Sequence, residues 1–172
     1  MNVLNKIFGK SKEDAALTCE PLVIYAPVSG KVIALKDFPD PVFSQEILGP
    51  GCGIIPSIEQ IIAPFNGVVI QLTDTKHAIG LKSEDGMELL IHIGVDTVDM
   101  NGIGFSSYVK EGQTVHMGEK LISFDKAAIR KANHSDTVAI IVTNADDFAG
   151  IEKLADDTVT AGTSLLKVQK EV

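Results

Sequence analysis

From about residue 22 onward, short runs of Val, Ile and Leu are separated by Gly, Pro, Asn and Asp. Such runs with turn residues at their ends predict short β-strands. Helical patterns are few: Asp125 is placed to cap a short helix over 126–132, and a second pattern lies over 146–154. We therefore expect an all-β fold in which any helices are brief connectors.

Apolar and polar residues alternate from Met87 to Asp96. Because successive side chains of a strand point to opposite faces, one face is wholly apolar and belongs to the core. It consists of Met87, Leu89, Ile91, Ile93 and Val95. The opposite face carries Glu88, Leu90, His92, Gly94 and Asp96. The pattern predicts that His92 points away from the interior, with open space beside it at Gly94.

A second strand is predicted over 73–81, with Thr75 and His77 as neighbours on one face, about 7 Å apart. At that separation the hydroxyl of Thr75 can hydrogen-bond one imidazole nitrogen and so determine which nitrogen faces outward. If this strand pairs with the strand of His92, the two imidazoles meet in one shallow pocket.

An internal repeat relates residues 26–35 to residues 63–72, with six of ten positions identical. Each copy contains Ala-Pro-x-x-Gly before a Val-Ile run, which predicts a tight turn entering a strand, and hence two related hairpin units. A third unit, 109–125, carries Gly112 and Gly118 between alternating apolar positions and predicts another hairpin. Together these units predict an antiparallel β-sandwich or flattened barrel with internal duplication.

The length of 172 residues suits one domain. We expect a tail over residues 1–18 and a domain over 19–172. The formal charge of −8 disfavours nucleic acid as a partner. Two cysteines, Cys19 and Cys52, are too few for a disulfide framework, and no run is long enough for a membrane span. These features indicate a protein of the cytoplasm, and we expect it to be a monomer.

The first dozen residues permit two interpretations. Val3, Leu4, Ile7 and Phe8 fall at helical spacing among lysines, so residues 1–12 can form an interfacial helix with weak affinity for a membrane surface. Alternatively they form a frayed tail, because so short a helix is marginal in water.

Imidazole is suited to carrying a phosphoryl group. Its ordinary pKa of about 6.5 leaves it mostly neutral and nucleophilic near pH 7. A second histidine can donate a hydrogen bond to the phosphoryl oxygens, and no Mg²⁺ is required. A lone histidine on a strand is more often structural, however, so spacing alone leaves His92 open. His116 and His134 lie in predicted turns, where we expect structural, exposed side chains.

The segment 86–98, Gly-Met-Glu-Leu-Leu-Ile-His-Ile-Gly-Val-Asp-Thr-Val, resembles the phosphorylation-site signature of glucose-class IIA components of the bacterial sugar phosphotransferase system. Thr75-Lys76-His77 resembles that family's Thr-x-His segment, and both Ala-Pro-x-x-Gly units match its repeats. The resemblance covers about residues 20–168. It departs from well-known members at Thr73 and Leu90, where aromatic residues often flank the site.

The resemblance implies a phosphocarrier in which His92 accepts a phosphoryl group on its tele nitrogen from the carrier HPr and passes it to a cysteine of a IIB domain. His77 would stabilise the phosphoryl group, and Thr75 would orient His77. Residues 39–43 resemble the loop bordering this site. Asp40 and Asp96 would then receive a basic side chain of HPr, and Phe43 and Ile47 would form an apolar rim. For the two acids, simple turn chemistry is an equal alternative.

The resemblance requires no cofactor, but it allows His77 and His92 to share Zn²⁺ with a partner's carboxylate, and it allows regulatory partners among permeases and metabolic enzymes. Two other functions are open. A regulatory binding module could keep the fold without turning over phosphate. A zinc peptidase could be built on a related sandwich, although only His92-x-x-x-Asp96 resembles part of its metal motif. The sugar served is not indicated by the sequence.

Overall fold

The fold is composed mainly of short antiparallel strands in a computed structural model that describes residues 18–171. The strands are β1 (Val23–Tyr25), β2 (Gly30–Ala34), β3 (Gly51–Pro56), β4 (Gln60–Ile62), β5 (Gly67–Leu72), β6 (Ala78–Ser83), β7 (Glu88–Ile93), β8 (Phe105–Ser107), β9 (Thr114–Val115), β10 (Lys120–Phe124), β11 (Val138–Val142), β12 (Gly150–Lys153), β13 (Thr158–Val159) and β14 (Ser164–Gln169). The α-helices are α2 (Pro41–Ser44) and α3 (Lys126–Lys131). Among the described residues, the 3₁₀ turns are η1 (Leu35–Asp37), η2 (Thr97–Met100) and η3 (Ala145–Asp147). The expected all-β class with short helices is confirmed.

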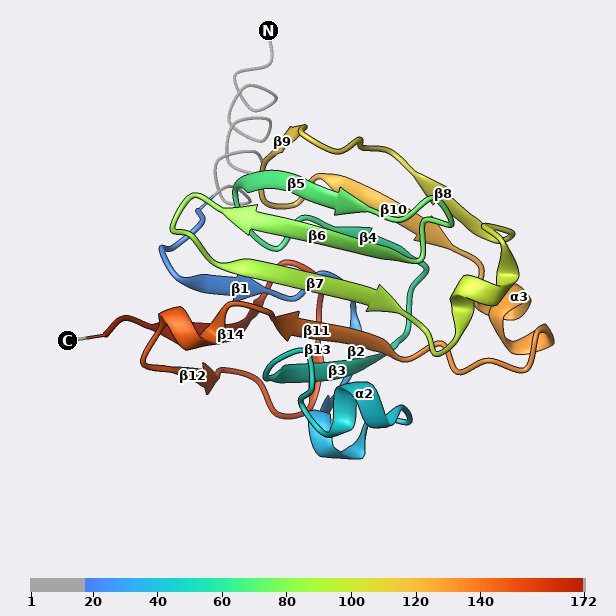
Figure 1. The fold of residues 1–172 in the computed structure, drawn as a ribbon, viewed down its shortest axis with the longest axis horizontal. Coiled ribbons are helices and arrows are strands. Elements are labelled where there is room, and N and C mark those ends of the chain that lie inside the picture. Colours follow the sequence, from blue (N-terminus) through green and yellow to red (C-terminus); the bar gives the residue numbers. More distant parts are fainter. Residues whose placement is uncertain (1–17, 172) are drawn as a thin grey trace, which may run out of the picture.

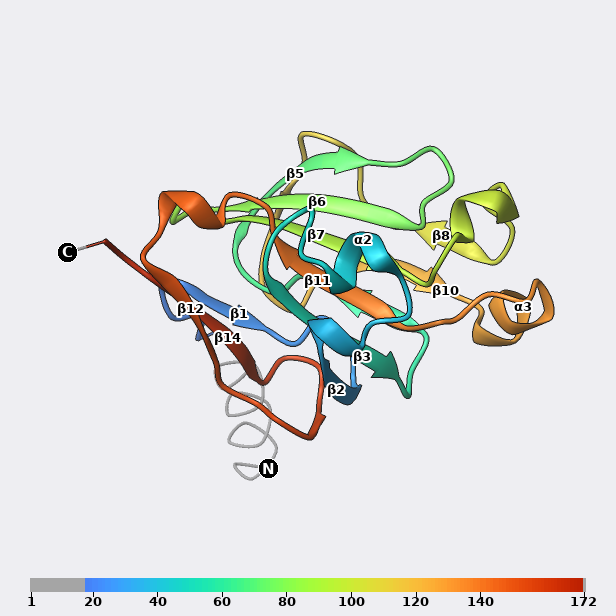
Figure 2. The same ribbon diagram turned by 60° about the horizontal axis from the view of Figure 1, so that its bottom comes forward.

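One large sheet dominates the molecule. Its eight strands lie in the order β13-β2-β3-β11-β7-β6-β5-β9, and every neighbouring pair is antiparallel. Two three-stranded sheets, β1-β14-β12 and β4-β10-β8, accompany it. Figure 1 shows β5, β6, β7 and β11 running side by side, and Figure 2 shows α2 in front of β11, with β1 and β14 together at the lower left.

The core lies between the large sheet and the two small ones. Buried side chains from all three sheets form one apolar cluster, in which Ile91 of β7, Leu165 of β14 and Ile122 of β10 are each fully buried. Full burial of such side chains contributes roughly 1.5–3 kcal/mol each. The fold is therefore an antiparallel sandwich closed by the hydrophobic faces of its layers.

Backbone hydrogen bonds confirm the internal duplication. The N–H of Tyr25 donates to the carbonyl of Pro64 at 3.0 Å, and the N–H of Ile62 donates to the carbonyl of Pro27 at 2.9 Å. Ile62 and Pro64 occupy, in the second repeat, the places of Tyr25 and Pro27 in the first, so the two repeats exchange equivalent bonds. The strand pair β2–β3 in one half likewise corresponds to β5–β6 in the other.

The unit 109–125 also has a structural counterpart, near the end of the chain. The Gly118 N–H donates to the Ala63 carbonyl, as the Gly162 N–H donates to the Ala26 carbonyl, each at 2.9 Å. β9 pairs with β5 as β13 pairs with β2. The hairpin predicted over 109–125 is wrong, because β9 and β10 pair with strands of two different sheets and not with each other.

A smaller apolar cluster covers part of the outer face of the large sheet. Phe38 and Phe43, from the segment carrying η1 and α2, pack with Ala139 and Ile141 of β11. Asp40 begins α2: its carboxylate accepts a hydrogen bond from the Val42 N–H at 2.9 Å. This cap and the following Pro41 fix the start of the helix. The segment thus lies against the sheet beside the strand that carries His92.

Three local predictions can be judged from the backbone. Asp125 caps α3 as expected, since its side chain accepts from the Ala128 N–H. The helix predicted over 146–154 is wrong: that region contains the end of η3 and strand β12. The strand predicted over 73–81 begins only at Ala78, because residues 73–77 form a turn in which Lys76 has φ of 59°.

Candidate functional site

β7 presents His92 on the outer face of the large sheet, as its alternation predicts. Met87, Leu89, Ile91 and Ile93 are buried in the core, while Leu90 and His92 are half-buried on the opposite face. Across the sheet, His92 lies opposite Ala78 of β6 and Ala139 of β11. These small neighbours leave room around the imidazole, and strands on both sides hold its backbone in place.

Gly94 determines which nitrogen of His92 is available for chemistry. The Nδ1 atom of His92 lies 2.8 Å from the carbonyl oxygen of Gly94. A carbonyl oxygen only accepts hydrogen bonds, so Nδ1 carries the proton and donates it. The tele nitrogen, Nε2, therefore holds the lone pair, as a nucleophile requires.

Gly94 adopts this position through its own backbone conformation. Its φ is 80°, in the left-handed region that favours glycine, and its N–H donates to the Thr137 carbonyl at 3.0 Å. The expected open space at Gly94 is wrong: an added Cβ would come within 2.5 Å of the Thr97 side chain and 2.8 Å of the Ser135 carbonyl. Val95, predicted in the core, instead packs against the outer cluster, because the chain turns at Gly94.

His77 lies beside His92, at the end of the turn that connects β5 to β6. The ring centroids are 5.0 Å apart and the rings meet edge to face at 80°. The Thr75 hydroxyl lies 2.6 Å from Nδ1 of His77. The side-chain pair predicted from the Thr-x-His spacing thus exists, although a turn and not a strand creates it. When Thr75 donates to Nδ1, the proton of a neutral His77 lies on Nε2.

Both imidazoles are neutral at pH 7. Burial and, to a smaller extent, the neighbouring His92 together lower the pKa of His77 from 6.5 to about 4. Burial also lowers the pKa of His92, against the opposing effects of the Gly94 hydrogen bond and the negative charges of Asp40 and Asp96. A neutral ring at each position keeps one nucleophilic nitrogen and one donor N–H available in the same site.

Asp40, Asp96 and Phe43 lie close to His92, whereas Ile47 lies on the exposed segment that follows α2. The two carboxylates lie near enough to favour protonated His92. Phe43 is only 4% exposed, and its ring centroid lies 5.0 Å from that of His92, so it forms a wall of the site. Ile47 is 64% exposed and has surface to offer a partner. The predicted partner contacts of all four residues stay predictions.

The remaining histidines and cysteines lie elsewhere. His116 is exposed and its Nδ1 lies 2.9 Å from a carboxylate oxygen of Glu119, in agreement with the predicted structural role. His134 is half-buried after α3. Cys19 and Cys52 are free thiols, and burial raises the pKa of Cys52 to about 12. Within residues 18–171, no three His, Cys, Asp or Glu side chains form a group able to hold a metal ion.

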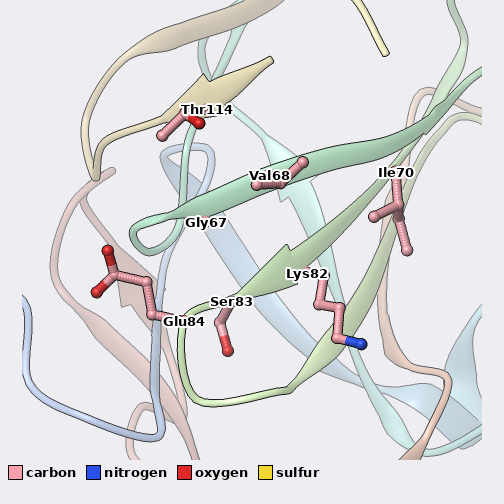
Figure 3. A pocket seen from close by; sticks show the side chains of 7 residues that line it. All are labelled: Gly67, Val68, Ile70, Lys82, Ser83, Glu84 and Thr114. Carbon is pink, nitrogen blue, oxygen red and sulfur yellow. The ribbon is translucent and has the colours of Figure 1, made fainter. Parts of the chain in front are cut away.

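An open hollow of about 490 Å³ lies over β5, β6 and β9 (Figure 3). It is lined by Gly67, Val68, Ile70, Lys82, Ser83, Glu84 and Thr114. None of these residues belongs to the histidine pair or contacts it, so this hollow is separate from the candidate site.

In the part of the chain that the structure describes, no helix has the length and apolar character to cross a membrane. The predicted membrane contact of residues 1–12 lies outside the described residues.

Comparison with known proteins gives the family. Residues 22–148 match the family described as the phosphoenolpyruvate-dependent sugar phosphotransferase system, EIIA 1. The chain is 42% identical over 171 residues to the glucose-specific EIIA component of Halalkalibacterium halodurans, covering 97% of this chain and 98% of that protein. It is 40% identical over 160 residues to the glucose-specific EIIA component of Staphylococcus aureus, covering 93% and 94%.

A solved structure agrees with these relatives. Glucose permease IIA from Mycoplasma capricolum superposes with a TM-score of 0.77 at 34% sequence identity, over 84% of this chain and 94% of that one. The chain therefore belongs to the EIIA 1 family of the sugar phosphotransferase system and is a phosphocarrier of that system. No finding favours the alternatives of a zinc peptidase or a regulatory module without turnover.

The sequence patterns did not predict the contacts that three parts of the site make. The Gly94 carbonyl that orients His92 is a backbone group, and nothing in the residue types marks its direction. Phe43 as a wall depends on the packing of α2 against β11, a contact between distant segments. Thr73, which contacts the turn of His77, is the third part. If residues 73–77 are taken as a turn, the four-residue spacing of Thr73 and His77 indicates that their side chains can meet.

Proposed function

We propose that His92 accepts a phosphoryl group on Nε2 from phosphohistidine of HPr and passes it to the cysteine of a IIB domain, in the cytoplasm and as a monomer. The observation that carries the proposal is the hydrogen bond from Nδ1 of His92 to the Gly94 carbonyl, which leaves Nε2 as the free nucleophile on an outward face. Support also comes from the lowered pKa of His92, because a neutral ring can attack phosphorus.

The two transfers exchange one bond to phosphorus for another. In the first, the N–P bond of the donor breaks while Nε2 of His92 forms a new N–P bond. In the second, the cysteine thiolate attacks phosphorus, the S–P bond forms and His92 regains its lone pair. Such transfers depend chiefly on in-line positioning and on stabilisation of the charge on the phosphoryl oxygens.

His77 supplies that stabilisation in our proposal. With Thr75 donating to Nδ1, the Nε2–H of His77 is free to donate to a phosphoryl oxygen on its neighbour. The same orientation persists at any pH well above 4, since His77 stays neutral there. Thr75 thus determines the tautomer that makes His77 a donor.

Asp40 and Asp96, near the nucleophile, and the exposed Ile47 suit a docking surface for HPr. The two carboxylates would attract a basic side chain of HPr, and Ile47 would contribute apolar area. Phe43 would act mainly by supporting His92 from the side, because little of it is exposed. Regulatory contacts with permeases or metabolic enzymes would use the same face.

The reaction we propose needs no cofactor. Zinc prefers four ligands, and the described histidine pair offers two ring nitrogens, so this chain alone supplies half of such a set. A carboxylate from a partner would be required to complete it. Zinc therefore belongs, in this proposal, to a complex and not to the phosphoryl transfer.

Reconstitution of the relay tests the proposal. Labelled phosphoenolpyruvate, enzyme I and HPr should label the protein, and addition of a IIB domain should remove the label and transfer it to that domain. Omission of HPr is the control, because labelling should then be lost. Failure of the complete mixture to label the protein would overturn the proposal. Pairing with individual IIB and IIC partners would then identify the sugar.

A further inference from the structure

The turn that carries His77 begins at Thr73, whose side chain makes contacts within it. Residues 73–77 connect β5 to β6, and the Lys76 N–H donates to the Thr73 carbonyl at 2.9 Å. Lys76 has φ of 59°, so the chain reverses within the turn. From the β7 side, the Ile93 N–H holds the carbonyl of His77 at 2.8 Å. On the β5 side, the Thr73 side chain contacts the Ala78 backbone and the His77 ring.

The Thr73 hydroxyl accepts the hydrogen bond from the Ala78 N–H that a backbone carbonyl would accept in a regular β-ladder. Thr73 lies opposite Ala78, and its N–H donates to the Ala78 carbonyl at 3.2 Å, as in a regular antiparallel ladder. The Thr73 carbonyl accepts from the Lys76 N–H and not from the Ala78 N–H, so the return bond of a regular ladder is not made there. The Ala78 N–H donates instead to Oγ1 of Thr73 at 3.2 Å.

The same hydroxyl reaches the ring of His77. Oγ1 of Thr73 lies 3.4 Å from Nδ1 of His77, on which the Thr75 hydroxyl also converges at 2.6 Å. Each hydroxyl has one hydrogen. Thr75, at the shorter distance, donates to Nδ1, while Thr73 donates to the Ala78 carbonyl at 3.2 Å. The Thr75 donor therefore favours the Nε2–H form of His77, whereas Thr73 donates no hydrogen to Nδ1 and supports the ring through its bonds to the Ala78 backbone.

We propose that Thr73 is a positioning residue for His77, acting through the Ala78 backbone and beside Nδ1. The inference rests on the proposed function of His92 and extends it, because the orientation of His77 matters for transfer only if His92 carries a phosphoryl group. A residue without a hydroxyl at position 73 would leave the Ala78 N–H without its partner and loosen the turn that holds Thr75 against His77.

Thr73→Val and Thr73→Ser separate this role from simple packing. Valine keeps the shape of threonine without the hydroxyl, whereas serine keeps the hydroxyl. We expect Thr73→Val to slow transfer from phosphorylated His92 to a IIB domain by about tenfold, the factor that corresponds to about 1.4 kcal/mol. Thr73→Ser should stay within about twofold of the parent. Thr114→Val, at an exposed position of β9, is the matched control and should have no effect.

Nitrogen NMR of the unphosphorylated protein gives a readout that a packing defect would not move. In the parent and in Thr73→Ser, we expect the Nε2–H form of His77. In Thr73→Val, we expect an added Nδ1–H population and faster hydrogen exchange at the Ala78 amide, with the spectrum of the core unchanged. Unchanged tautomer, unchanged exchange and unchanged transfer in Thr73→Val would overturn the role of Thr73. These spectra need no phosphoryl donor, so a parent protein that fails to label would refute the function of His92 separately.

Discussion

His92→Ala should abolish labelling by the phosphoenolpyruvate relay. His92 is the histidine whose Nε2 is left free by a backbone carbonyl on an outward face. His77 cannot replace it, because its Nδ1 is engaged by Thr75 and its side chain is 6% exposed. The expected result is labelling at the background level, measured against the parent protein under identical conditions.

Two further variants make this result specific. His92→Gln can still donate to the Gly94 carbonyl yet has no nucleophilic nitrogen, so it should fold normally and stay unlabelled. His116→Ala removes an exposed histidine distant in sequence from the site and should label like the parent. His77→Gln should accept the phosphoryl group and pass it on more slowly. Label persisting in His92→Ala would mean that another residue is the acceptor.

Gly94→Ala should damage both stability and phosphoryl transfer. The left-handed φ of 80° costs a non-glycine residue about 1–2 kcal/mol. The new Cβ would also meet Thr97 and the Ser135 carbonyl, at 2.5 and 2.8 Å, so the backbone must shift. Such overpacking adds about 1–3 kcal/mol. Because the Gly94 carbonyl orients His92, the same shift should disturb the nucleophile.

Gly112→Ala is the matched control for Gly94. Gly112 has a similar φ of 84°, but an added Cβ there would meet nothing within 4 Å. We expect it to cost only the conformational term, about 1–2 kcal/mol, and to leave labelling unchanged. Urea unfolding and the initial labelling rate measure the two effects. The account of Gly94 fails if Gly94→Ala is no more destabilising than Gly112→Ala and labels at the parent's rate.

Strand alternation made much of the fold predictable. The apolar positions of β7 from Met87 to Ile93 are buried as expected, because one sheet face rests on the core. The repeated Ala-Pro-x-x-Gly units also predicted the two related strand pairs. Pairing between distant strands was harder to predict from the sequence. The glycine spacing indicated a hairpin over 109–125, whereas β9 and β10 of this segment belong to two separate sheets.

The errors at the site come from backbone geometry. Residues 73–77 were expected to belong to the strand that continues to residue 81, but Lys76 adopts a left-handed conformation and turns the chain. Gly94 was interpreted as free space, although its conformation and its carbonyl are what matter. The residue pattern alone left His92 open, and the resemblance of residues 86–98 and 75–77 to the family's motifs supplied the predicted roles of His92, His77 and Thr75. A residue pattern predicts neither the direction of the Gly94 carbonyl nor the use of the Thr73 hydroxyl as an acceptor for the Ala78 N–H.

The central claim is that Nε2 of His92 forms the bond to phosphorus. The most direct test is nitrogen and phosphorus NMR of the protein labelled with ¹⁵N-histidine, before and after phosphorylation through the relay. We predict that Nε2 of His92 shifts and couples to phosphorus while Nδ1 keeps its proton against Gly94. Phosphorus bonded to Nδ1 of His92, or to any other residue, would contradict the account.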